Sequence, residues 1–211
     1  MRRFVLATCM NIAILFALAN VAAAGTVTLT FNSVNGASQG GVYVSPYYGT
    51  VNGVPTGFVC DDFIHEVTFG ETWDAFVSTF DGLDHVRFHG TNAADTLKMY
   101  DEAAFLLEKM WTEPAHWGDL NFAIWAIFSP TQAEGSSGWT AGAQADLALA
   151  QSQAYAPGQF AGLRIYTPLT TGNPQEFIGF NPTPTPAPEP GTMLLLGSGL
   201  LVGLVRRRRS Q

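Results

Sequence analysis

The chain has 211 residues, 47% of them hydrophobic and 13% charged, and a formal net charge of −7. Of the ten Lys and Arg side chains, two lie at the N-terminus and four at the C-terminus; all seventeen acids lie between Asp61 and Glu189. The stretch 25–189 therefore holds four basic and seventeen acidic side chains, a formal charge of −13. Such a surface repels nucleic acid and anionic lipid, and it offers no basic patch for a phosphate ligand.

The first 24 residues have the features of a secretory signal peptide. Arg2 and Arg3 form a basic start, residues 4–18 are mostly apolar, and Ala22-Ala23-Ala24 is a small-residue cleavage site. We expect cleavage before Gly25. This removes Cys9 and leaves Cys60 without an intrachain partner, which excludes a disulfide-stapled scaffold.

The first half of the exported part is predicted to form strands. Its β-rich runs are separated by turn residues, and Asn52-Gly53 between two of them is a strong hairpin signal. Pro55 places the start of the returning strand after the turn or at an edge. The expected strands are 27–31, 42–48, 54–60, 63–69, 72–80 and 85–88.

The apolar period then changes to a helical one. We expect helices over 93–111, 119–128 and 141–155, with Asn92 as the first N-cap. The second is apolar on nearly every side before Pro130, so it should be buried. Strands at 163–167 and 176–180 complete the globular domain, residues 25–180. The prediction is an α+β fold: an antiparallel β-sandwich or partly closed barrel with about three inserted helices.

The C-terminal region contains three consecutive segments. Residues 181–190 form a Pro-rich linker, expected to be an extended stalk. An uncharged apolar stretch follows, and we expect a transmembrane helix over 192–205. The basic cluster after it consists of Arg206, Arg207, Arg208 and Arg209. This cluster should stay cytoplasmic, which places the preceding domain outside the inner membrane.

The order of Pro188-Glu189-Pro190-Gly191, apolar helix and arginine cluster resembles the PEP-CTERM sorting signal of Gram-negative bacteria. The resemblance covers residues 188–211 and implies recognition and cleavage by an exosortase, a membrane transpeptidase. It also implies export through the inner membrane, transient anchoring, and release to the cell surface or the extracellular matrix. The implied setting is biofilm, with extracellular polysaccharide as a candidate partner. We expect no cofactor.

Cys60-Asp61-Asp62 after an apolar strand, and Asn121-Phe122-Ala123-Ile124-Trp125, together resemble bacterial thioester domains of surface adhesins. In those domains a cysteine and a glutamine form an internal thioester. The glutamine position holds Asn121 here, one methylene shorter. A second resemblance, to a group of PEP-CTERM surface proteins, includes residues 60–63, 102–106 and 123–125 and implies no activity. Cys60 and Asn121 are therefore candidates for a thioester, and the alternative is a buried, unreactive Cys60.

Other constellations do not predict catalysis or a metal site. His85 and His89 alternate with apolar residues, and on a strand they would lie ~13 Å apart, too far for one metal. Asp61-Asp62 with Glu66, and Asp81 with Asp84, match no calcium loop. We expect a non-enzymatic protein with no catalytic residues, no metal and no nucleic-acid partner; a covalent adhesin using Cys60 and a matrix polysaccharide hydrolase remain the alternatives.

Overall fold

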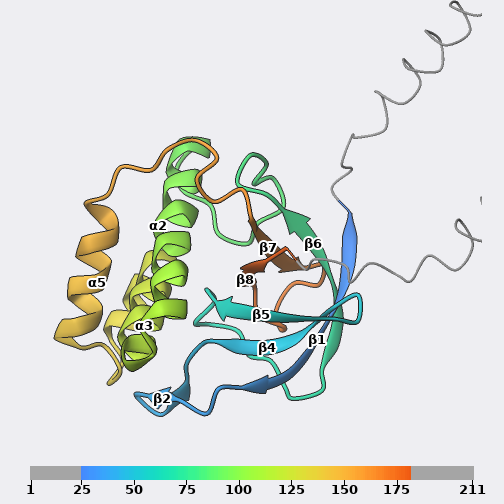
Figure 1. The fold of residues 1–211 in the computed structure, drawn as a ribbon, viewed down its shortest axis with the longest axis horizontal. Helices are drawn as coiled ribbons and strands as arrows, with labels where there is room; N and C mark the ends of the chain where they lie inside the picture. Colours follow the sequence, from blue (N-terminus) through green and yellow to red (C-terminus); the bar gives the residue numbers. More distant parts are fainter. Residues whose placement is uncertain (1–24, 182–211) are drawn as a thin grey trace, which may run out of the picture. The chain divides into compact units, whose positions relative to one another are not determined.

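A computed structural model describes residues 25–181 (Figure 1). The expected signal peptide 1–24, the linker from residue 182 onward and the expected membrane helix 192–205 lie outside the described residues. Within 25–181, no helix has both the length and the apolar character needed to cross a bilayer.

Six strands form a closed antiparallel barrel in the order β1-β4-β5-β8-β7-β6. A separate two-stranded hairpin, β2 (Ser38–Gln39) with β3 (Val42–Tyr43), lies between β1 and β4 in the chain. The barrel strands are β1 (Thr26–Val34), β4 (Tyr47–Val51), β5 (Val54–Cys60), β6 (Thr72–Ser78), β7 (Leu163–Pro168) and β8 (Phe177–Phe180). The α+β class with a barrel is confirmed, and the sheet is closed, because β6 pairs with both β1 and β7.

The predicted hairpin is present between β4 and β5. Val51 pairs with Val54, and Asn52 and Gly53 both have positive φ, at 49° and 78°, as a type I′ turn requires. Pro55 pairs with β4 on one side, whereas β8 pairs with β5 only from Phe58 onward. The proline therefore lies on an unpaired edge of β5, where its missing N–H costs no ladder hydrogen bond.

Two of the expected strands are absent, and a third, 42–48, is divided between β3, which ends at Tyr43, and β4, which begins at Tyr47. Residues 63–69 form a loop, because the Asp62 carboxylate accepts the backbone N–H groups of Ile64 and His65 and turns the chain. Residues 85–88 also form no strand, since the Arg87 N–H donates to the Glu176 carboxylate instead of to a neighbouring strand.

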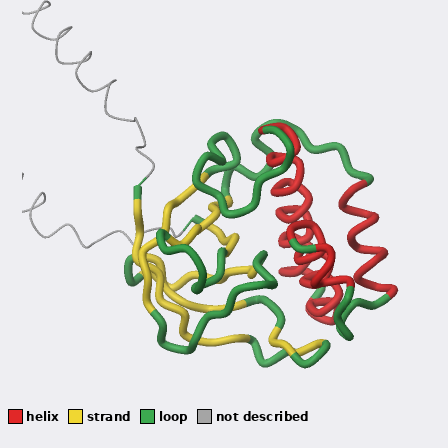
Figure 2. Tube along the Cα trace, turned by 180° about the vertical axis from the view of Figure 1, so that it is seen from behind, coloured by secondary structure: helices red, strands yellow, loops and turns green. Residues whose placement is uncertain are grey.

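The helices lie together on one side of the barrel (Figures 1 and 2). In the chain they follow β6 and precede β7. They are α2 (Ala93–Thr112), the short 3₁₀ helix η1 (Pro114–His116), α3 (Trp117–Phe128), α4 (Pro130–Glu134) and α5 (Ala141–Gln151). Asn92 caps α2 as expected, accepting the N–H of Asp95. The prediction of about three helices omitted α4, because Pro130 ends one helix and also starts the next, at a position where proline is favoured.

The core has two parts that share α3. One part fills the barrel and includes Phe58, Cys60 and Phe177; the other lies between the barrel wall and the helices and includes Val59. Helix α3 contributes Trp125 to the first and Ile124 to the second. This double contact explains why α3 is apolar on nearly every side.

Candidate functional site

The end of β5 and the start of β8 bring two distant polar segments together. Cys60 pairs with Phe177 in the ladder, so Asp61-Asp62 and Gln175-Glu176 lie just beyond the same end of the barrel. Asp61, Asp62 and Glu176 are fully buried. Buried carboxyl groups are costly unless they are neutral, paired or hydrogen-bonded, so each of them requires a physical explanation.

The structure brings the candidate thioester pair together through hydrogen bonds. The Asn121 side-chain nitrogen donates to the Cys60 carbonyl at 2.9 Å, and its oxygen accepts the Ser45 N–H at 2.6 Å. The Ser45 hydroxyl in turn accepts the Cys60 N–H at 2.9 Å. Both ends of the Asn121 amide therefore bind backbone groups. This arrangement gives Asn121 a structural role, in joining α3 to two chain segments of the barrel, that requires no acyl link to Cys60.

The Cys60 thiol is also held inside the barrel. It is fully buried, and it donates to the Asp62 carbonyl at 3.3 Å. Burial raises the pKa of the Cys60 thiol well above its ordinary value, and the negative charge of Asp62 raises it further. Because the thiolate is the reactive form, both effects disfavour reaction at this sulfur.

We therefore expect slow labelling of Cys60 by a thiol reagent in native buffer and full labelling after unfolding, because the folded barrel shields the sulfur. Mass spectrometry of the mature protein should give the sequence mass. Rapid native labelling would contradict burial. A mass deficit of about 17 Da, the mass of one ammonia molecule, with no labelling after unfolding would instead indicate a Cys60–Asn121 thioester.

Asp62 forms a buried ion pair that ties three loops together. The Arg87 guanidinium donates to the Asp62 carboxylate, and His65 Nδ1 lies 2.8 Å from the same carboxylate. Arg87 also donates to the carbonyls of Gly172 and Pro174 at 3.0 Å each. A charged carboxylate in this position is stable because Arg87 is permanently protonated and close. The cluster thus holds the loop after β5 against the loop before β8.

Asp61 and Glu176 form a second, differently satisfied carboxyl pair. Glu176 accepts hydrogen bonds from Tyr100 at 2.5 Å, from the Arg87 N–H at 2.7 Å and from the Thr167 hydroxyl. No N–H or O–H group within residues 25–181 donates to either carboxyl oxygen of an ionised Asp61, whereas a protonated Asp61 can donate to Glu176. Burial raises the pKa of Asp61 well above its ordinary value, and the neighbouring Glu176 and Asp62 charges raise it further.

The raised pKa of Asp61 predicts a pH-dependent effect of Asp61→Asn. In the unfolded chain this carboxyl ionises at pH ~4, whereas burial and the nearby charges keep it protonated in the folded protein to higher pH. The folded state thus binds an extra proton above pH ~4, and stability falls as the pH rises through the folded pKa. Asp61→Asn should therefore stabilise the protein at pH 7, by about 1.4 kcal/mol for each pH unit by which the folded pKa of Asp61 exceeds its unfolded value.

This gain should shrink as the pH falls toward the ordinary carboxyl pKa, where Asp61 is protonated in both states. Urea unfolding of both proteins at several pH values measures it. Asp74→Asn is the matched control, because Asp74 lies near the surface and its carboxylate accepts the Thr28 hydroxyl. A gain from Asp61→Asn that does not vary with pH would contradict the assignment.

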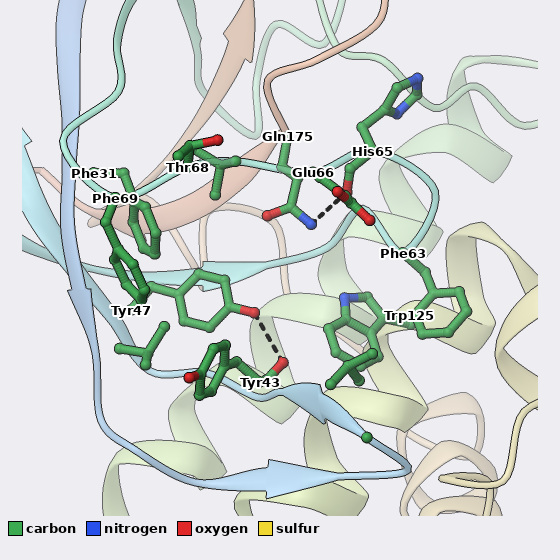
Figure 3. Close-up of a pocket in the computed structure, with 14 residues that line it drawn as sticks. Phe31, Tyr43, Tyr47, Phe63, His65, Glu66, Thr68, Phe69, Trp125 and Gln175 are labelled. Carbon is green, nitrogen blue, oxygen red and sulfur yellow. Dashed lines mark hydrogen bonds between the residues drawn. The ribbon is translucent and has the colours of Figure 1, made fainter.

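An open cavity of about 400 Å³ lies beside these clusters (Figure 3). Its wall comes from barrel strands, the β2–β3 hairpin, the loop 63–69, helix α3 and the loop before β8. The side chains labelled in Figure 3 are Phe31, Tyr43, Tyr47, Phe63, His65, Glu66, Thr68, Phe69, Trp125 and Gln175. Six of these ten are Phe, Tyr or Trp, and Glu66 is the one acidic side chain among the lining residues.

The other predicted polar residues do not form a metal site. The His85 ring stacks on Phe76, with centroids 4.4 Å apart, and His89 lines a separate cavity with Asp81 and Asp84. Among residues 25–181, no three His, Cys, Asp or Glu side chains form a group that could hold a metal ion.

The structure does not test the residues of the expected sorting signal. All of them lie outside the described residues, so the structure neither confirms nor corrects their expected role. They are Pro188, Glu189, Pro190, Gly191, Arg206, Arg207, Arg208 and Arg209.

Sequence reasoning did not identify Arg87, Glu176 or Gln175. Arg87 carried a usable signal, because it is one of four basic residues in a strongly acidic stretch and lies between apolar neighbours. Glu176 and Gln175 carried no such signal, since most of their partners are 76 to 113 residues away in the chain. Tyr43 and Phe69 lay in segments that were expected to be ordinary strands.

Comparison with known proteins supports the C-terminal resemblance. Residues 186–209 match the family model described as the PEP-CTERM protein-sorting motif, and this range includes both the Pro-Glu-Pro signature and the arginine cluster. Comparison with curated proteins and with solved structures finds no significant match. The matched segment marks an exported protein that is anchored in the membrane before processing by an exosortase. It does not extend into the barrel domain, so the role of that domain must be argued from its own geometry.

Proposed function

We propose that this PEP-CTERM sorting-domain protein acts, once an exosortase has processed it, as a non-enzymatic binding or structural component of the cell surface or extracellular matrix. Its partner in this proposal is extracellular polysaccharide in a biofilm. The observation that carries the proposal is the open aromatic cavity of about 400 Å³ on a domain that the sorting motif marks for export. Concave sites of this size lined by aromatic and a few polar side chains are typical of small-ligand binding.

The distribution of carboxyl groups favours binding over hydrolysis. Glycoside hydrolases usually place two carboxyl groups on either side of the bond to be broken. Here Asp62 is paired with Arg87 and Glu176 is bound by Tyr100 and Thr167, so both are engaged inside the protein. Glu66 is the one acidic side chain that lines the cavity. The covalent adhesin is likewise less favoured, because the amide of Asn121 is bound to backbone groups.

Cosedimentation of the processed, exported protein with exopolysaccharide from the producing bacterium tests this function. We expect the protein to pellet with the polysaccharide and the polysaccharide to keep its length. A folded protein that stays in the supernatant would contradict the association. Release of new reducing ends would indicate a hydrolase instead. Resistance of the pelleted protein to boiling in detergent would indicate a covalent link.

A further inference from the structure

We propose that the aromatic cavity binds one pyranose ring of a neutral or amine-bearing saccharide, and that it excludes uronate and phosphate-bearing sugars. The inference rests on the proposed function and narrows it to a site and a ligand class. It follows from the ring faces, the hydrogen-bonding groups and the charge of the cavity wall.

Two exposed rings form the mouth of the cavity. Tyr43 is 51% exposed and Phe69 is 56% exposed, and their centroids lie 6.2 Å apart in an edge-to-face arrangement. Phe69 stacks on the buried Phe31 at 5.2 Å, and the Tyr47 hydroxyl donates to the Tyr43 carbonyl at 2.9 Å. The Phe69 ring thus rests on a buried ring, and the Tyr43 backbone is held by Tyr47. Together the two exposed rings present apolar area against which the C–H face of a sugar ring can pack.

Gln175 provides an acceptor whose orientation is determined by its contacts. Its side-chain nitrogen donates to the carbonyls of Asp62 and His65, at 3.1 Å and 2.6 Å. Only an amide nitrogen can serve two carbonyl acceptors, so the side-chain oxygen must take the other position. In Figure 3 that oxygen points toward the cavity, on the side of Tyr47. It can accept a hydrogen bond from a sugar hydroxyl.

Trp125 provides a donor at the floor of the cavity. It is 2% exposed, and its Nε1 has no nitrogen or oxygen acceptor within residues 25–181; its polar neighbour there is the Cys60 thiol. In Figure 3 the Nε1 edge of the indole lies on the side facing Gln175 and Tyr47. A wholly apolar ligand would leave the Gln175 side-chain oxygen without a donor, which disfavours that class.

The charge of the wall selects among saccharides. None of the four Lys and Arg residues in the described range lines the cavity, whereas Glu66 does. His65 also lines it, but its Nδ1 lies 2.8 Å from the Asp62 carboxylate, which already pairs with it. The described range carries sixteen acidic side chains against these four basic ones. Uronates and sugar phosphates would therefore enter a negative potential without a cation to pair with. Neutral sugars avoid this repulsion, and a protonated amino sugar gains attraction to Glu66.

Calorimetric titration of the processed protein with three oligosaccharide sets tests the site: neutral, amine-bearing and uronate chains. We expect binding of the first two and none of the third. Tyr43→Ala and Phe69→Ala should each weaken binding about tenfold, equivalent to about 1.4 kcal/mol. Tyr48→Ala is the matched control, because Tyr48 is 43% exposed on β4 but does not line the cavity. It should leave affinity unchanged.

Two further variants examine the polar contacts. Trp125→Phe keeps a ring at the floor but removes the Nε1 donor, and it should weaken binding while the protein stays folded by circular dichroism. Glu66→Gln should reduce affinity for amine-bearing chains and spare the neutral ones.

The outcomes distinguish a failure of the saccharide-site proposal from a failure of the proposed polysaccharide-binding function. If the protein pellets with exopolysaccharide but Tyr43→Ala and Phe69→Ala do not weaken binding, the cavity assignment is wrong while the proposed function stands. Tighter binding of uronates than of neutral sugars would overturn the charge argument. If no oligosaccharide binds and the protein also fails to pellet with exopolysaccharide, both the site's ligand class and the polysaccharide association are wrong.

Discussion

Replacing Glu189 and Pro190 with alanine is expected to leave the protein uncleaved in the inner membrane. Both residues lie inside the segment that matches the sorting motif, 186–209. The change leaves the following apolar stretch and Arg206–Arg209 intact, so insertion should still occur while recognition by the exosortase is lost. The expected effect is a near-complete loss of processing. Fractionation of the cells, followed by immunoblotting for the exported domain, measures it.

A matched control replaces Thr183 and Pro184, which lie in the same Pro-rich linker but before the matched segment. That variant should be processed as the original protein is. If the Glu189 and Pro190 variant is cleaved and released normally, the processing enzyme does not recognise the protein through this motif. If the control is also retained in the membrane, the composition of the linker, not the motif, controls processing.

Trp125→Ala is expected to destabilise the domain by about 3–5 kcal/mol, the range of large-to-small changes in a core. The indole is 2% exposed and packs with Phe63 and Phe122, with ring centroids 5.0 Å and 4.9 Å away. Removing it leaves a cavity where α3 meets the barrel interior. Because a domain has only about 5–15 kcal/mol of stability, the loss should be large in chemical denaturation.

The same substitution at two isoleucines provides the matched comparison. Ile124 is fully buried, and Ile64 is 53% exposed. Ile124→Ala should cost about 2–5 kcal/mol, and Ile64→Ala should stay within about 0.5 kcal/mol. Similar losses at the two positions would mean that α3 is not packed as described. A loss below about 1 kcal/mol for Trp125→Ala would mean the same.

Local patterns accounted for many of the elements. Short-range signals predicted three features: the Asn52-Gly53 turn, the Asn92 cap and the change from strand to helical periodicity. Each of these depends only on residues that are close together in the chain. Residues 63–69 and 85–88 were mistaken for strands for the same reason. Their apolar alternation is real, but the carboxylates of Asp62 and Glu176 capture their backbone N–H groups.

The sequence by itself determined the resemblance to an exported, exosortase-sorted protein and the α+β class, because both are written in contiguous patterns of charge, apolar length and turn residues. Only the tertiary structure decided that the sheet closes into a barrel, since closure depends on pairing between β6 and β7, on either side of the helices in the chain. The tertiary structure also decided which residues surround the cavity. Tyr43, Phe69, Trp125 and Gln175 come from four separate segments, and no local rule relates them. Barrel closure and helix packing bring them around one cavity, and the ion pair of Asp62 holds the loops that carry part of its wall.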